Sequence, residues 1–258
     1  MEDKDFLYFI AKVKESTNID LSQYKEAQMK RRLTTLRTKH GHPSFASFYE
    51  AMMKDKKVMH EFLDRMTINV SEFWRNPNRW QILSDTFLKD MIARNPRLKC
   101  WSAACSTGEE PYSLAMILAE KGVLQNSRLD ATDIDDGALE KAKQALYLER
   151  SLRDVPSLYT SKYVRQDGSM YRIDERLTKA VNFKKQNLLT DTFDQEYDLI
   201  ICRNVMIYFT EEAKHVLYHK FAKSLKRGGI LFVGSTEQIF TPGQYGLESA
   251  ETFFYRKI

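Results

Sequence analysis

The sequence predicts an α/β protein. Its centre is a parallel, Rossmann-type sheet with helices on both faces, and an all-helical N-terminal domain and a small antiparallel β insertion accompany it. Apolar residues recur at helical spacing, with no β-rich stretch, through about the first 75 of the 258 residues. Short apolar runs then alternate with helical segments, as in parallel βαβ units. Between residues 148 and 182 this alternation is broken by an Asp-Gly turn flanked by strand-like runs, which is typical of a hairpin.

Residues 1–75 are predicted to form the helical domain. Phe6, Phe9, Ile10 and Val13 share one helix face, and further helices are expected after Ser44 and over residues 58–66. A helix from residue 21 to 40 is predicted to end at Gly41, a suitable C-cap. Against one acid, Glu26, this helix carries the bases Lys25, Lys30, Arg31, Arg32, Arg37 and Lys39. The basic helix 25–39 is either a solvated face or a surface that steers an acidic partner.

Residues 76–258 are predicted to form the sheet domain, with the insertion at 148–182. Asn76-Pro77 is a good helix start, and that helix continues to about residue 94. The other expected elements are strand 98–103, helix 109–121, strand 128–133, helix 136–146, strands 181–185 and 197–202, helix 211–226, and strands 229–233 and 252–257. In such sheets a ligand binds at the carboxyl ends of the strands.

Composition restricts the class of protein. Hydrophobic residues make up 43% and charged residues 29% of the chain, as in a soluble globular protein. We expect no membrane insertion, because no apolar run approaches the roughly 18 residues of a membrane span, and no secretion signal. Cys100, Cys105 and Cys202 lack metal-ligand spacing, so we expect no metal site and interpret them as buried thiols of a cytoplasmic protein. The net charge of +5 allows an anionic partner without identifying it.

The segment Trp101–Ser113 carries the main chemical signal. It follows a predicted strand and opens a predicted helix, where a nucleotide-like cofactor lies on this kind of sheet. Only Gly108 is a glycine, so the G-x-G-x-x-G pattern is absent. Glu109 and Glu110 would repel a pyrophosphate at this helix start and match a cationic ligand, such as an ammonium or a sulfonium. The alternative is an acidic first turn that only stabilises the helix.

Asp133 ends the next predicted strand, on the order of 20 residues after that loop, where a carboxylate accepts hydrogen bonds from ribose hydroxyls. An acid at a strand end is often only a cap, and capping the next helix is the expected role of Asp135. The preceding Trp101–Ser113 segment supports the interpretation of Asp133 as a ribose ligand.

Long motifs carry a family resemblance. They are Ser102–Ser113 (SAACSTGEEPYS), Thr132–Asp135 (TDID), Asn187–Leu189 (NLL), Cys202–Phe209 (CRNVMIYF) and Thr67–Arg75 (TINVSEFWR). In this order and over nearly the whole chain, they resemble the CheR-type chemotaxis receptor methyltransferases. The resemblance implies a Rossmann-like S-adenosylmethionine methyltransferase sheet. It also implies transfer of a methyl group to glutamate side chains of methyl-accepting chemotaxis receptors, with glutamate methyl esters and S-adenosylhomocysteine as products.

The resemblance also assigns roles to single residues. Asn69, Ser71 and Arg75 resemble residues that close over the cofactor, and Glu109 or Glu110 resembles the acid that contacts the methionyl ammonium. Asp133 resembles the ribose ligand, Asn187 and Leu188 the residues at the adenine edge, and Arg203 and Asn204 the residues under the methionine. Arg75 and Tyr208 resemble the catalytic pair beside the reactive methyl group. Without the resemblance, Arg75 is equally a cap or an interdomain ion pair, and Tyr208 a core aromatic.

The implied partner is the cytoplasmic helical domain of a chemotaxis receptor, reached through the basic helix 25–39. In part of the family the β insertion also docks a C-terminal receptor peptide at its edge. Here the turn at residues 165–169 is shorter than in those members, which argues against peptide docking without deciding it.

Two other functions compete with this one. A nucleic-acid methyltransferase typically has an Asn/Asp-Pro-Pro-aromatic turn where this chain has Arg203-Asn204-Val205-Met206, and its basic residues are concentrated in one helix, so we expect no nucleic-acid partner. A module that senses S-adenosylmethionine without catalysis would not need Arg75 and Tyr208.

Overall fold

The computed structural model describes residues 2–67 and 71–258. Contacts divide the chain into two compact units. One contains Met1–Asn69 and Met206–Leu217, and the other contains Val70–Val205 and Tyr218–Ile258. Asn69, one of the expected cofactor residues, lies outside the described residues.

The first unit is helical. Its N-terminal elements are α1 (Glu2–Thr17), η1 (Leu21–Gln23), α2 (Glu26–Lys39), α3 (Phe45–Lys54) and α4 (Lys56–Thr67). The helix expected over residues 21–40 is divided, because Asp20 caps a short 3₁₀ turn by accepting a hydrogen bond from the Ser22 N–H. The basic helix α2 therefore begins only at Glu26, and Gly41 follows it with a φ of +73° as the expected C-cap residue.

Aromatic side chains build the core of the helical unit. The Phe9 ring of α1 lies 5.2 Å from Phe45 and 6.0 Å from both Phe48 and Phe62, between ring centroids. All four side chains are fully buried. The helical spacing of apolar residues is thus confirmed as the pattern of a helical core.

A short segment distant in sequence, Met206–Leu217, belongs to this unit as well. It contains η5 (Met206–Tyr208) and the start of α11 (Glu211–Ser224). The Lys25 N–H donates to the Tyr208 carbonyl over 2.8 Å, and the rings of Tyr24 and Phe209 lie 5.0 Å apart. These contacts hold Tyr208 against the beginning of α2.

The second unit contains the main sheet. Its strands are β1 (Lys99–Ala103), β2 (Arg128–Asp133), β6 (Val181–Lys185), β7 (Tyr197–Cys202), β8 (Leu225–Val233), β9 (Leu247–Glu251) and β10 (Phe254–Lys257). The strand order is β6-β2-β1-β7-β8-β10-β9, with parallel pairing from β6 to β8 and antiparallel pairing at β10. The Rossmann-like fold class is confirmed. The sequence prediction missed β9, because only Leu247 of this edge strand is buried.

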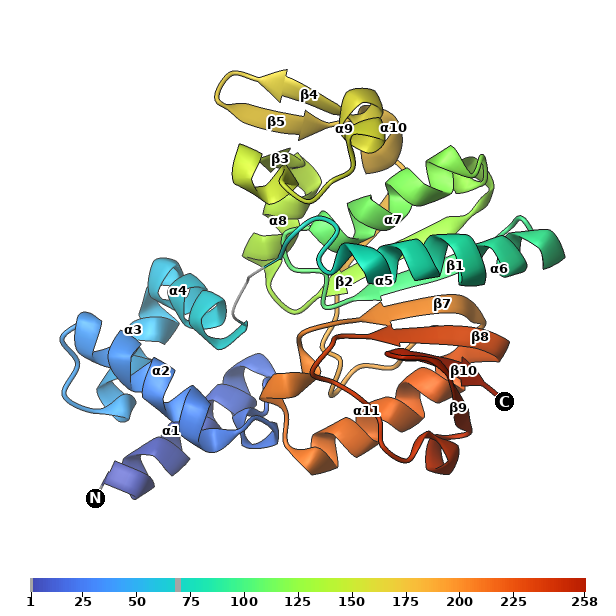
Figure 1. The fold of residues 1–258 in the computed structure, drawn as a ribbon. Coiled ribbons are helices and arrows are strands. Elements are labelled where there is room, and N and C mark those ends of the chain that lie inside the picture. Colours follow the sequence, from blue (N-terminus) through green and yellow to red (C-terminus); the bar gives the residue numbers. More distant parts are fainter. Residues whose placement is uncertain (1, 68–70) are drawn as a thin grey trace. The chain divides into compact units, whose positions relative to one another are not determined.

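Helices cover both faces of the main sheet. They include α5 (Pro77–Ile82), the π-helical η2 (Leu83–Leu88), α6 (Lys89–Arg94), α7 (Glu109–Glu120), η3 (Leu124–Asn126), α8 (Asp136–Gln144) and η6 (Pro242–Tyr245). Figure 1 shows α5, α6 and α7 on one side of the sheet and α11 on the other. The elements α5, η2 and α6 follow one another without a gap, so the helix expected over residues 76–94 is continuous and π-helical in its middle.

The antiparallel insertion is confirmed too (Figure 1). Its elements are β3 (Leu146–Tyr147), η4 (Glu149–Leu152), α9 (Ser157–Tyr163), β4 (Val164–Asp167), β5 (Met170–Ile173) and α10 (Glu175–Thr178). The strands have the order β3-β5-β4. Only Gly168 and Ser169 separate β4 from β5, and Gly168 has the positive φ (+61°) that such a turn requires.

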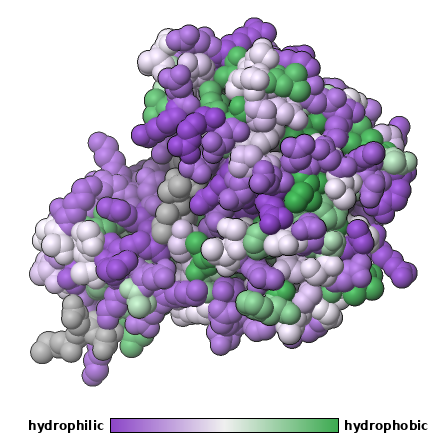
Figure 2. Space-filling view, in the orientation of Figure 1, coloured by the Kyte–Doolittle hydropathy of each residue, from purple (hydrophilic) through white to green (hydrophobic). Residues whose placement is uncertain are grey.

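Burial follows the expected pattern. The three cysteines are free thiols and fully buried. On the face seen in Figure 2, hydrophilic residues predominate and apolar residues lie scattered among them. Among the helices of the described chain, none combines the length and the apolar character that crossing a bilayer requires.

Candidate active site

The β1–α7 loop lies at the carboxyl end of the main sheet. Ala104 and Ser106 have positive φ angles of 60° and 49°, which non-glycine residues adopt mainly where the surrounding structure enforces them. The Cys105 N–H donates to the Thr132 carbonyl over 2.9 Å. This bond ties the loop to the end of β2 and holds its unusual backbone.

Gly108 starts α7 and cannot be replaced by a larger residue without strain. Its φ is +94°, and a Cβ at this position would lie 2.9 Å from the Ala142 Cβ and 3.0 Å from the Tyr147 hydroxyl. The same hydroxyl donates to the Thr107 carbonyl over 2.7 Å. One glycine thus serves the close packing of α7 on α8 and β3.

Glu109 and Glu110 have different surroundings, which sequence alone could not distinguish. The Thr107 hydroxyl donates to Glu109 Oε2 over 2.7 Å, and the Ser71 side chain also hydrogen-bonds this carboxylate. Glu110 Oε1 accepts a hydrogen bond from the Ser102 hydroxyl over 2.7 Å, and Arg203 Nη1 lies 4.0 Å from Oε2. Burial raises the pKa of Glu110 to about 7, so this carboxyl holds a proton much of the time near neutrality.

Asp133 lies buried at the end of β2. Its Oδ2 accepts from the Ser106 N–H over 2.8 Å and its Oδ1 from the Asp135 N–H over 3.0 Å. Burial outweighs these hydrogen bonds and raises the Asp133 pKa to about 6. Asp135 caps α8, as predicted, by accepting from the N–H groups of Gly137 and Ala138.

Arg203 follows β7 and is buried. Its guanidinium carbon lies 4.7 Å from the Phe232 ring centroid, and Nη2 donates to the Arg75 carbonyl (2.9 Å) and to Asn76 Oδ1 (2.7 Å). Arg203 Nε is buried and has no hydrogen-bond partner within residues 2–67 and 71–258. A buried donor without an acceptor is costly, so this atom favours an anionic ligand.

Asn204 adopts a left-handed conformation, with a φ of +61°. Its N–H donates to Glu237 Oε2 over 2.6 Å, and the same oxygen accepts from the Gly234 N–H over 2.8 Å. Glu237 therefore joins the carboxyl ends of β7 and β8. Nothing in the sequence pointed to Glu237, because a glutamate in a loop after a strand belongs to no recognisable pattern.

Asn187 and Leu188 lie in the loop that follows β6. The Gln186 N–H donates to the Asp133 carbonyl over 2.8 Å, which brings the loop beside the end of β2. Asn187 Oδ1 accepts from the Leu189 N–H over 3.0 Å, and the Leu188 side chain is buried.

Arg75 and Tyr208, the expected catalytic pair, belong to different units. The Arg75 side chain is one-third exposed, and its Nε lies 4.0 Å from Glu72 Oε2. In the helical unit, the Arg32 guanidinium lies 5.3 Å from the Tyr208 ring centroid. Thus Ser71, Arg75, Glu109, Glu110 and Arg203 are linked by contacts within the sheet unit, and Tyr208 is linked to the basic helix.

Metal chemistry has no candidate site in the described chain. In that part of the protein, no group of three or more His, Cys, Asp or Glu side chains could hold a metal ion.

Two family models together match most of the chain. The model of the CheR methyltransferase S-adenosylmethionine-binding domain matches residues 69–254, and the model of the CheR methyltransferase all-alpha domain matches residues 4–67. The chain belongs to the CheR methyltransferase family. This CheR-family chain is an S-adenosylmethionine-dependent methyltransferase.

Curated CheR relatives align with this chain over almost their full length. The chain is 41% identical to a chemotaxis protein methyltransferase of Listeria monocytogenes serovar 1/2a, over 99% of this chain and 98% of the relative. It is 32% identical to a chemotaxis protein methyltransferase of Borreliella burgdorferi, over 93% of this chain and 89% of the relative.

Proposed function

We propose that this CheR-family enzyme transfers a methyl group from S-adenosylmethionine to glutamate side chains of methyl-accepting chemotaxis receptors, which gives glutamate methyl esters and S-adenosylhomocysteine. Its relatives are named chemotaxis protein methyltransferases. The observation that carries the donor site is the buried pair of Glu110 and Arg203 at the carboxyl ends of β1 and β7: the Glu110 pKa is raised to about 7, and Arg203 Nε has no acceptor within residues 2–67 and 71–258.

The amino-acid end of the donor fits this pair. Glu110 accepts a hydrogen bond from the Ser102 hydroxyl and lies 4.0 Å from Arg203, yet burial raises its pKa to about 7, so a further cation beside it would stabilise its ionised form. Glu109 is already bonded to Thr107 and Ser71. We therefore assign the methionyl ammonium to Glu110. Arg203 Nε, buried without an acceptor in the described chain, suits the methionyl carboxylate.

The remaining assignments follow the same edge of the sheet. Asp133 would accept hydrogen bonds from the ribose, and Asn187 with Leu188 would contact the adenine edge. Asn204 would form the floor under the methionine, and Ser71, Arg75 and Asn69 would close over the donor. Support comes from the contacts of these residues: Asp133 and the Asn187 loop share the Gln186 hydrogen bond, and Ser71 reaches Glu109.

The chemistry needs little besides position. The donor supplies a methyl group already activated by a sulfonium, and a glutamate side chain is already an anion at neutral pH, so no general base is required. The chain must orient the carboxylate and exclude the water that solvates it. We propose that Arg75 attracts the substrate carboxylate and that the Tyr208 hydroxyl orients one of its oxygens.

We propose that α2 is the surface through which the enzyme binds the receptor. Its cations lie over aromatic rings of the same unit: Lys30 Nζ is 5.2 Å from Phe6, Arg37 is 4.8 Å from Phe45, and Arg32 covers Tyr208. Such contacts restrain the side chains, and an aromatic ring does not neutralise the Arg32 or Arg37 guanidinium that it contacts. Together with the exposed Arg31 they create a positive surface that leads to Tyr208. Its complement is the acidic helical domain of a receptor in the cytoplasm.

Peptide docking on the insertion is not required by this proposal. β4 is the outer strand of the small sheet, so a receptor peptide has an edge to pair with. The turn of only two residues beside that edge offers little further surface. We expect receptors without their C-terminal peptide to be methylated as fast as complete receptors.

The test is incubation with methyl-labelled S-adenosylmethionine and receptor-containing membranes. Alkali should release the label as methanol, because glutamate methyl esters are base-labile. Bulk RNA in place of receptor should stay unlabelled. Alkali-stable label on the receptor, or label on RNA, would contradict the proposal.

A further inference from the structure

The β6–β7 loop (residues 186–196) joins two parallel strands through turns. The structure describes all of this loop, and the loop contains no helix. Its first half is a compact turn. The Asn187 N–H donates to Asp191 Oδ2 (2.9 Å), the Asp191 N–H donates to the Asn187 carbonyl (2.9 Å), and the Leu189 N–H donates to Asn187 Oδ1 (3.0 Å). The Asn187 side chain is therefore part of the turn's own hydrogen bonding.

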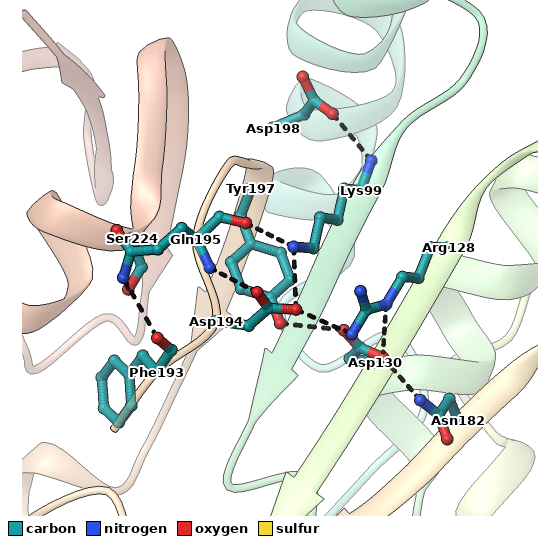
Figure 3. Close-up of polar contacts among 10 residues, drawn as sticks. All are labelled: Lys99, Arg128, Asp130, Asn182, Phe193, Asp194, Gln195, Tyr197, Asp198 and Ser224. Carbon is teal, nitrogen blue, oxygen red and sulfur yellow. Dashed lines mark hydrogen bonds and ion pairs between the residues drawn. The ribbon is translucent and has the colours of Figure 1, made fainter. Parts of the chain in front are cut away.

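The second half of the loop is anchored to the sheet by ion pairs (Figure 3). Asp194 pairs with Lys99 over 3.0 Å and with Arg128 over 2.9 Å, and Arg128 also pairs with Asp130. The Tyr197 hydroxyl donates to Asp130 over 2.9 Å. The hydrogen bond with Lys99 lowers the Asp194 pKa to about 2, so the anchor persists at any physiological pH.

Lys220 of α11 provides the anchor of the first half. Its ammonium donates to the carbonyls of Leu188 (2.6 Å) and Asp191 (2.7 Å) and lies 4.1 Å from the Phe193 ring centroid. The peptide group between Leu188 and Leu189 is thus held at both ends, at its oxygen by Lys220 and at its N–H by Asn187 Oδ1. Fixing this plane fixes the Asn187 side chain.

We propose that Lys220 is a positioning residue of the donor site, which orients Asn187 and Leu188 for adenine by holding the carbonyls of Leu188 and Asp191. The inference rests on the proposed placement of adenine against Asn187 and Leu188. Lys220 makes no contact with the reacting atoms in this arrangement. It acts through the loop, so its effect falls on donor affinity and base selectivity.

The test measures binding of S-adenosylhomocysteine to Lys220→Met by calorimetry. Charge-assisted hydrogen bonds are lost, so we expect binding roughly tenfold weaker than in the wild type. The preference for S-adenosylhomocysteine over S-inosylhomocysteine, which differs at the base edge, should shrink as well. Lys220→Arg should recover much of both. Lys223→Met, which removes an exposed lysine on the same helix, is the matched control and should bind like the wild type.

Kinetics and a second variant separate positioning from general damage. With receptor membranes, Lys220→Met should raise the donor KM and leave kcat at saturating donor near the wild-type value. A lowered kcat with unchanged KM would overturn the inference, as would wild-type affinity and selectivity. If Lys220→Met folds poorly, Lys220→Gln replaces it, and wild-type binding by a folded Lys220→Gln has the same consequence.

Asn187→Ala tells the two proposals apart. Weaker binding by Asn187→Ala with unchanged binding by Lys220→Met would remove only the role of Lys220. Unchanged binding by Asn187→Ala would remove the proposed adenine placement, and with it this inference.

Discussion

At the scale of single residues, proton binding is the property that most distinguishes the candidate site. Burial raises the pKa of Glu110 to about 7 and that of Asp133 to about 6, against ordinary values of 4.5 and 3.8. Between those values the folded chain holds protons that the unfolded chain has released. These two groups therefore stabilise the fold relative to the unfolded chain less as pH rises from about 4 to 7. A cationic ligand beside Glu110 would reverse part of this loss.

The first prediction concerns Glu110 and the pH dependence of donor binding. An ammonium next to Glu110 favours the ionised carboxylate, so binding must release a proton where Glu110 is protonated. Affinity for S-adenosylhomocysteine should increase as pH rises from 5.5 to about 7 and then level off. Calorimetry in two buffers with different ionisation heats should detect proton release at pH 6.

Glu110→Gln should bind roughly tenfold more weakly at pH 7.5 and should lose the Glu110 part of the pH dependence. Glu109→Gln is the matched control and should change affinity less, because the Glu109 carboxylate already has its partners in Thr107 and Ser71. A larger effect at Glu109 than at Glu110 would exchange their assigned roles.

The second prediction concerns Glu237. One carboxylate oxygen accepts the N–H groups of both Asn204 and Gly234, and Glu237→Ala would leave both donors without their acceptor. We expect a loss of about 1–3 kcal/mol in the free energy of unfolding, together with weaker donor binding as the left-handed Asn204 turn relaxes. Urea denaturation and calorimetry measure the two effects. Glu237→Gln retains an acceptor oxygen and should lose less; equal losses would show that charge, not hydrogen bonding, is decisive.

At the scale of elements, α7 links the β1–α7 loop, where we propose that the cofactor binds, to the rest of the sheet unit. A glycine with positive φ stands at each end: Gly108 (+94°) before the helix and Gly122 (+70°) after it. Their surroundings differ. A Cβ on Gly108 meets Ala142 at 2.9 Å, whereas a Cβ on Gly122 has no neighbour within 4 Å.

The third prediction compares alanine at these two positions. Gly122→Ala should cost about 1 kcal/mol of stability, the strain of a left-handed alanine. Gly108→Ala adds a steric conflict with α8 and should cost more, about 2–4 kcal/mol. It should also weaken S-adenosylhomocysteine binding, which Gly122→Ala should not do. Thermal melts with and without ligand check both statements. Equal losses of stability in the two variants would mean that α8 shifts easily to accommodate the added methyl group.

At the scale of the whole molecule, the net charge of +5 is concentrated where a partner is expected. The basic residues of α2 share a unit with Tyr208, and Arg32 touches its ring. Arg31 is exposed, whereas Arg32 is half-buried. We therefore propose separable roles for the two arginines, Arg31 in long-range attraction and Arg32 in local support of Tyr208.

The fourth prediction follows from that difference. Arg31→Glu should slow receptor methylation several-fold at low salt and reduce its salt sensitivity, because steering of exposed charges is screened by ions. Arg32→Ala should lower kcat even at high salt, because Tyr208 loses its covering guanidinium. Initial rates between 20 and 300 mM salt distinguish them. If Arg31→Glu shows the wild-type rate and salt response, α2 is only a solvated face.

Local patterns in the sequence were sufficient for the architecture. Apolar spacing around Phe9 predicted a helical core, the alternation after Asn76 predicted the parallel sheet, and Asp167-Gly168 predicted the hairpin, because each depends on residues close together in the chain. The same locality accounts for the errors. The edge strand β9 has little apolar pattern, and the π-helical turn at Leu83–Leu88 leaves no signal in the periodicity.

The chain's motifs alone determined the family and the residues around which a donor site is proposed. Only the tertiary structure decided how those residues are held: that Glu109 is bonded to Thr107 and Ser71 whereas Glu110 is bonded to Ser102 and lies beside Arg203, that Glu237 joins two strand ends, and that Lys220 anchors the Asn187 turn from a helix more than 30 residues away. The physical reason is that burial and hydrogen bonding arise between segments distant in sequence. Such contacts set pKa values and orientation, and no local pattern encodes them.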